Sequence, residues 1–133
     1  MSNVRVGLGV TLLLGLTLSA LLMLMATAPA QAQTCQTEID ELKSLTAEAT
    51  FLGKNAEKAQ ANLLLKLDEA NAKFEKVKYQ DAIDKLTDFQ NTVIALDAGS
   101  KIDSGDASIL ITGAEEAKGC VRGLQAQTPT ATA

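Results

Sequence analysis

The sequence predicts an all-α protein, a small up-down bundle of four helices closed by one disulfide. Beyond residue 32, apolar residues recur at steps of three and four, which is the spacing of one helix face. Gly, Asn and Asp residues interrupt this pattern at short links. Two cysteines, Cys35 and Cys120, stand near the two ends of the helical region. A three-helix core with one short appended helix is the alternative.

Residues 1–32 have the layout of a secretory signal peptide. Met1–Arg5 is polar with one positive charge, Val6–Leu24 is an almost unbroken apolar run, and two Ala-x-Ala sites follow. We expect cleavage after Ala32, with Ala30 as the second choice. The apolar run is also long enough to span a bilayer, so an uncleaved anchor is the alternative. Cleavage would leave an exported protein, periplasmic or extracellular, without stable membrane insertion.

The first helix is expected to span Cys35–Leu52 and to stop at Gly53. Acidic residues gather in its first turns, where the helix dipole favours them. Its apolar residues recur at helical spacing and indicate a core-facing side: Ile39, Leu42, Leu45, Ala49 and Leu52.

Residues 61–93 are expected to form a helical hairpin around which the chain is organised. Asn55 is a good N-cap for its first helix. Phe74 and Tyr79 are five residues apart, which breaks the helical rhythm and predicts a turn at Lys76–Lys78. One long helix over residues 55–96 is the alternative. The apolar stripes are Leu64, Leu67, Ala70 and Phe74, then Tyr79, Ala82, Ile83, Leu86, Phe89 and Val93.

The run Leu63-Leu64-Leu65 covers more than one helix face, which predicts that the first hairpin helix is packed on two sides. The second hairpin helix is expected to end at Gly99, in a left-handed cap.

The last helix is expected to start at a cap formed by Asp103 or Ser104. Gly113 and Gly119 weaken it or allow close approach of a neighbour. The bundle domain is expected over residues 33–124, followed by a disordered tail at 125–133 that is small, polar and without pattern. The apolar residues of this helix are Ala107, Ile109, Leu110, Ala114, Ala117 and Val121.

Cys35 and Cys120 are expected to form a structural disulfide, because two cysteines in an exported protein usually pair. Up-down order places the start of the first helix and the end of the fourth at the same end of the bundle. Closing a loop of about 85 residues would contribute on the order of 4 kcal/mol by the chain-entropy estimate. A redox or metal pair is disfavoured, since the sequence has no CxxC and no histidine.

Composition argues against several classes of function. The net charge is −4, and loss of Arg5 with the leader makes the remainder more acidic, so nucleic acid is not an expected partner. The sequence lacks histidine, a Gly-rich phosphate loop, GxSxG and metal-ligand spacing. Paired carboxylates are adjacent, so they point different ways on a helix: Asp40/Glu41, Asp68/Glu69 and Glu115/Glu116. We therefore expect no catalytic residues, no metal and no cofactor.

The apolar stripes of residues 61–93, followed by Gly99, Lys101 and Ile102 and then by Leu110 and Ile111, resemble the FIMAH domain, a small helical module of bacterial exported proteins. The resemblance covers about residues 39–117, and it implies a non-catalytic role in interaction or attachment. The family usually has a glycine in the hairpin turn, where this chain has Val77. The matching positions are Leu64, Lys66, Leu67 and Ala70, then Tyr79, Ala82, Ile83, Leu86, Phe89 and Val93, then Gly99, Lys101, Ile102, Leu110 and Ile111.

These observations together predict an exported, non-catalytic interaction module that binds another exported protein or a cell-surface component. The alternatives are an inhibitor of an exported enzyme and a carrier of a small apolar ligand between the helices.

Overall fold

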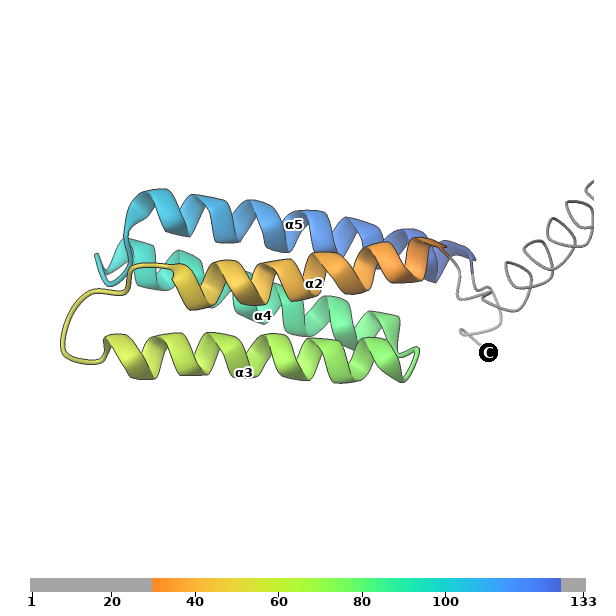
Figure 1. Ribbon diagram of the computed structural model, residues 1–133, viewed down its shortest axis with the longest axis horizontal. Helices are drawn as coiled ribbons and strands as arrows, with labels where there is room; N and C mark the ends of the chain where they lie inside the picture. The colour runs from red at the N-terminus through yellow and green to blue at the C-terminus, as the bar shows by residue number, and fades with distance from the viewer. Residues whose placement is uncertain (1–29, 128–133) are drawn as a thin grey trace, which may run out of the picture. The chain divides into compact units, whose positions relative to one another are not determined.

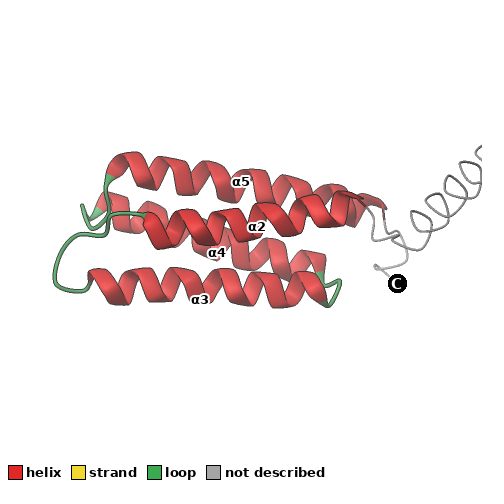
Figure 2. Ribbon diagram, in the orientation of Figure 1, coloured by secondary structure: helices red, strands yellow, loops and turns green. Residues whose placement is uncertain are grey.

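The computed structural model describes residues 30–127, which form four α-helices (Figures 1 and 2). They are α2 (Ala30–Glu48), α3 (Ala56–Glu75), α4 (Tyr79–Ala98) and α5 (Ser104–Gln127). Each has 19 residues or more, so the predicted four-helix bundle is confirmed and the version with one short helix is wrong. The expected leader lies outside the described residues except for its last three, which form the first turn of α2.

The helices follow up-down order, and each lies beside the next, with α5 returning to α2 (Figure 1). Polar contacts and the disulfide join the neighbouring pairs across the bundle. They are Lys43 Nζ to Asp68 Oδ1 at 2.6 Å for α2 and α3, Lys85 Nζ to Glu69 Oε2 at 2.9 Å for α3 and α4, Lys118 Nζ to Gln90 Oε1 at 2.7 Å for α4 and α5, and Cys35–Cys120 for α2 and α5.

The core is built from the apolar face of each helix, as the spacing predicts, with differences in α3 and α5. Leu63, not Leu64, is the fully buried leucine at the start of the α3 stripe. Leu65 is 56% exposed, so α3 is not packed on two sides, and Ile109 of α5 is 51% exposed. The largest fully buried side chains are Phe89, Ile39, Leu42, Leu63, Leu67, Leu86, Ile102, Leu110, Val93 and Val121.

The predicted turn between α3 and α4 is confirmed, and Val77 occupies its left-handed position with φ 60°. The Lys78 amide donates to the Lys73 carbonyl at 2.9 Å, and the Val77 amide donates to the Phe74 carbonyl at 2.9 Å. These two bonds form a Schellman motif, which satisfies carbonyls that the helix end leaves open. The long-helix alternative is therefore wrong.

The end of α4 repeats this motif one residue later than expected. Gly99 has φ −88°, whereas Ser100 has φ 54° and takes the left-handed position. The Ser100 amide donates to the Asp97 carbonyl at 3.0 Å, and the Lys101 amide donates to the Leu96 carbonyl at 2.8 Å. The expectation that Gly99 supplies the left-handed cap is wrong, because the register of these bonds places Ser100 there.

Both predicted N-terminal caps stand at the expected positions, but only Asp103 makes capping hydrogen bonds. Asp103 caps α5, since its Oδ2 accepts from the amides of Gly105 at 3.1 Å and Asp106 at 3.2 Å. Asn55 stands at the N-cap of α3, but its side chain makes no capping hydrogen bond.

The bundle end at which α2 starts and α5 stops is closed by the predicted disulfide. Cys35 and Cys120 are bonded with an S–S distance of 2.00 Å and a Cα–Cα distance of 5.5 Å. Helix α5 runs to Gln127, three residues past the expected domain boundary, and Gln127 Nε2 donates to Gln31 Oε1 at 2.7 Å. Helix α2 starts at Ala30 rather than at Cys35, because its first turn packs along this extended end of α5.

Candidate functional site

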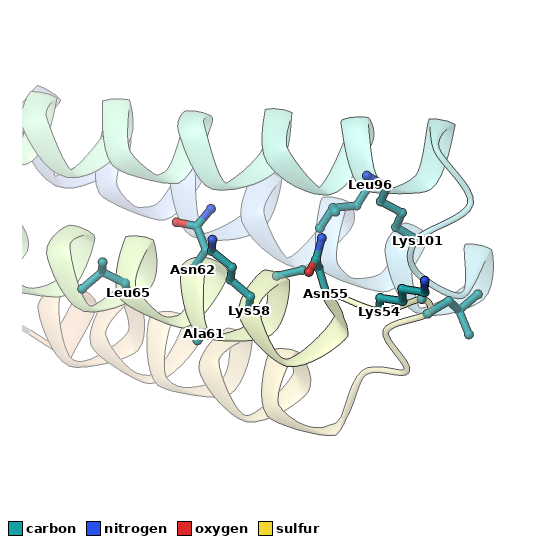
Figure 3. Close-up of a pocket in the computed structure, with 11 residues that line it drawn as sticks. Lys54, Asn55, Lys58, Ala61, Asn62, Leu65, Leu96 and Lys101 are labelled. Carbon is teal, nitrogen blue, oxygen red and sulfur yellow. The ribbon is translucent and has the colours of Figure 1, made fainter.

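A groove of about 760 Å³ lies at the end of the bundle opposite the disulfide, and we call it the loop-end groove (Figure 3). It runs along the first half of α3 and is bordered by the link from α2 and by the end of α4. Figure 3 shows Lys58 and Asn62 on the α3 side, with Leu96 and Lys101 across from them. The lining residues are Leu52, Gly53, Lys54, Asn55, Lys58, Ala59, Ala61, Asn62, Leu65, Leu96 and Lys101.

The wall of the groove is fixed by a short antiparallel pairing between the two links at this end. Phe51 and Ile102 form an isolated β-bridge. The Leu52 amide donates to the Lys101 carbonyl at 2.8 Å, and the Asp103 amide donates to the Thr50 carbonyl at 2.9 Å. These bonds join the α2–α3 link to the α4–α5 link. The groove wall is therefore held in place by backbone hydrogen bonds.

Side-chain alternation along this pairing explains what faces the groove. Successive side chains of an extended segment point to opposite sides. Ile102 is 2% exposed and Phe51 packs against the core, so their neighbours Lys101 and Leu52 are turned outward. The sequence expectation placed Leu52 in the first helix, but α2 ends at Glu48 and Leu52 is 45% exposed on the groove wall.

The apolar part of the groove consists of leucines that are not fully buried in the core. Leu65 is 56% exposed on α3, and Leu96 of α4 is half-buried. Lys58, Asn62 and Leu65 stand at positions i, i+4 and i+7, which share one face of a helix. The third leucine of the Leu63-Leu64-Leu65 run therefore faces the groove rather than a second packing partner.

Three lysines, Lys54, Lys58 and Lys101, line the groove beside these leucines. The ion pairs among the described residues engage other lysines and leave these three without a carboxylate partner. The first turn of α3 also opens here, where exposed amides and the helix dipole favour negative charge. The groove therefore combines an apolar surface with a positive rim in a chain of net charge −4.

The cysteines and the adjacent carboxylates considered in the sequence lie outside the groove. Cys35 and Cys120 are at the opposite end and are held in the disulfide. Adjacent carboxylates diverge, since Asp68 pairs with Lys43 of α2 and Glu69 pairs with Lys85 of α4. Within residues 30–127, no group of three or more cysteine or carboxylate side chains is arranged to hold a metal ion. None of the helices in that range is long and apolar enough to cross a membrane.

The sequence reading missed the groove because its wall depends on the pairing of two links far apart in the chain. The helical spacing predicted that Leu52 is the last core-facing residue of the first helix. The run Leu63-Leu64-Leu65 predicted that the next helix is packed on two sides. The i, i+4, i+7 placement of Lys58, Asn62 and Leu65 was a usable signal, since it puts charge, amide and leucine on one face.

No protein-family model, curated protein or solved structure matches this chain.

Proposed function

We propose that this protein is an exported, non-catalytic binding module that engages another exported protein or a cell-surface component through the loop-end groove. The observation that carries the proposal is the groove itself, where Leu52 and Leu65 are 45% and 56% exposed on a hydrogen-bonded framework. Apolar surface left open beside polar residues is typical of binding sites.

A non-catalytic role is supported by how the ionisable side chains are used. The sequence contains no histidine. Glu115 accepts hydrogen bonds from Gln90 and Lys118, while Asp68 and Glu69 bridge to two different helices. These carboxylates connect neighbouring helices. None of them lines the loop-end groove.

Export is supported by the leader-like residues 1–32 and by the Cys35–Cys120 disulfide, a bond that persists in oxidising compartments. Membership of the FIMAH family is part of the same proposal. The left-handed φ of 60° at Val77 supports it, because this is the turn position at which the family usually has glycine.

A carrier of a small apolar ligand is the second candidate. It is favoured by the groove volume of about 760 Å³, which lies within the range of small-molecule sites.

Leu65→Glu tests the proposal, with Ile109→Glu as the matched control. Both residues are about equally exposed, at 56% and 51%, but only Leu65 lines the groove. The oxidised wild-type protein and both variants are immobilised and exposed to envelope and culture-medium fractions of the source cells. We expect one component, identified by mass spectrometry, to be retained by the wild type and by I109E and lost with L65E. Retention by L65E at the wild-type level, or no retained component, would contradict the proposal.

A further inference from the structure

We propose that the loop-end groove binds an organic anion with an alkyl body, which lies along the exposed leucines while the anionic head is held by the lysines. This inference rests on the proposed function, because it names the chemical class that the same groove recognises.

The charge of the head follows from the lysines. Lys54, Lys58 and Lys101 line one groove, and the ion pairs of the described residues engage other lysines. No carboxylate of residues 30–127 forms an ion pair with these three lysines. A ligand anion provides that compensation, and charge-assisted hydrogen bonds to lysine are stronger than neutral ones. A cationic ligand would face repulsion from the same three ammonium groups.

The apolar body follows from the leucines. Leu52 lies on the link that forms the groove wall, Ala59 and Leu65 lie on α3, and Leu96 of α4 lies across from α3. From Asn55 to Leu65 the groove follows α3 for about 15 Å at 1.5 Å per residue, a length that suits a medium alkyl chain. Burying such a chain removes apolar surface of both ligand and protein from water.

The groove is large enough for a molecule of this class. A volume of about 760 Å³ holds a drug-sized or acyl-sized molecule. Two of the lining residues, Gly53 and Ala59, are small. Lysine is a flexible point charge and does not select between planar and tetrahedral anions, so carboxylate and phosphate heads share the required chemistry.

Decanoate is the first probe, because it carries both an alkyl body and an anionic head. Its dissociation constant for the oxidised protein is measured by titration calorimetry, and its site is mapped by amide shifts in two-dimensional NMR. Decyltrimethylammonium reverses the charge, decanol removes it, and butyrate shortens the body. Decyl phosphate reports whether the head is better matched by a phosphate than by a carboxylate.

We expect decanoate to bind with one-to-one stoichiometry and to shift amides at residues 52–58 and 96–101. Decyltrimethylammonium and butyrate should each bind at least about tenfold more weakly, since each lacks one of the two interactions. Equal affinity for the anionic and cationic probes, shifts confined to other residues, or no binding of either anionic decyl probe would overturn the inference.

Charge-matched variants test the lysines. Lys58→Gln combined with Lys101→Gln should weaken decanoate binding about tenfold. Lys76→Gln combined with Lys78→Gln changes the net charge equally at the opposite end of the bundle, and should change affinity less than about twofold. Equal losses in both pairs would overturn the inference, because they would indicate a general charge effect.

The capture experiment with L65E separates this inference from the proposed function. If L65E abolishes capture while neither anionic probe binds wild type, the groove is a binding site but its ligand is of another class. If decanoate binds in the groove while L65E still captures every component, the site is real but the proposed partner contact is wrong.

Discussion

At the scale of single residues, Val77 combines a β-branched side chain with a left-handed backbone. This conformation costs about 1–2 kcal/mol for a residue with a Cβ atom. The Schellman bonds of Lys78 and Val77 hold the residue there because the α3–α4 turn requires it. The strain is the local cost of placing a hairpin turn where the sequence offers no glycine.

We expect Val77→Gly to increase the free energy of unfolding by about 0.5–1 kcal/mol. Glycine removes the backbone strain, and its greater freedom in the unfolded chain offsets part of that gain. Urea denaturation of oxidised protein measures the change. Lys76→Gly is the control, because Lys76 has φ −85° and gains nothing from glycine. A Val77→Gly variant that is less stable than the wild type would contradict this account.

Glu38 on α2 is the other residue whose surroundings are unfavourable, in this case for its charged form. Its Oε2 atom is buried and finds no hydrogen-bond partner within the described residues. Burial raises the pKa of Glu38 above its ordinary 4.5, and repulsion from Glu116 and Glu41 raises it further. The folded state therefore holds this proton to a higher pH than the unfolded state does.

The raised pKa of Glu38 makes the stability of the protein depend on pH. Between pH 4.5 and the raised pKa, the folded state binds more protons, so Glu38 lowers stability as the pH rises through this window. We expect Glu38→Gln to be more stable than the wild type at pH 7 and the difference to shrink below pH 4.5. Urea midpoints across this range measure it, with exposed Glu48→Gln as the control. A difference that does not vary with pH would rule out titration of Glu38 as the cause.

At the scale of the elements, Gly113 and Gly119 of α5 have opposite roles. A Cβ atom at Gly113 would lie 3.0 Å from Leu42 Cδ1 of α2, whereas one at Gly119 would meet nothing within 4 Å. The first glycine allows α2 and α5 to approach closely, and the second only lowers helix propensity.

We expect Gly119→Ala to stabilise the protein by about 0.5–1 kcal/mol through helix propensity. Gly113→Val should destabilise it by about 1–3 kcal/mol, because its extra methyl groups overpack the α2–α5 contact. Thermal and urea unfolding of the pair provides an internal comparison. Equal effects of the two substitutions would show that packing against Leu42 is unimportant.

The helices were predictable because local spacing determines them, but several of their ends were not. The Phe74 to Tyr79 break located the hairpin turn, and Asp103 identified the start of α5. The end of α2 depends instead on pairing of Phe51 with Ile102, a contact between links that a local pattern does not contain. The loop-end groove is built on that pairing, which is why the sequence did not reveal it.

At the scale of the whole molecule, the Cys35–Cys120 disulfide encloses nearly the entire bundle, with a sequence separation of 85. This pairing was predictable because up-down order by itself brings both cysteines to one end. A covalent link over so long a segment restricts the unfolded chain strongly.

We expect Cys35→Ala combined with Cys120→Ala to lower the free energy of unfolding by about 2–5 kcal/mol. Hydrogen exchange should accelerate most in α2, since α2 is joined to α5 by this bond. Reduced wild-type protein is the control and should behave like the double variant. Reaction of both thiols with an alkylating agent before reduction, in protein taken from its export compartment, would contradict the presence of the bond.

The short distance across this disulfide has a further consequence, for the order in which the helices are connected. With 5.5 Å between the two Cα atoms, and with Gln31 in contact with Gln127, the described chain nearly forms a closed ring. A circular permutant that joins these ends by a flexible linker and opens at Lys76–Val77 would keep all four helices and relieve the strained turn. We expect it to fold to the same bundle, because helix faces and not chain order select which surfaces meet.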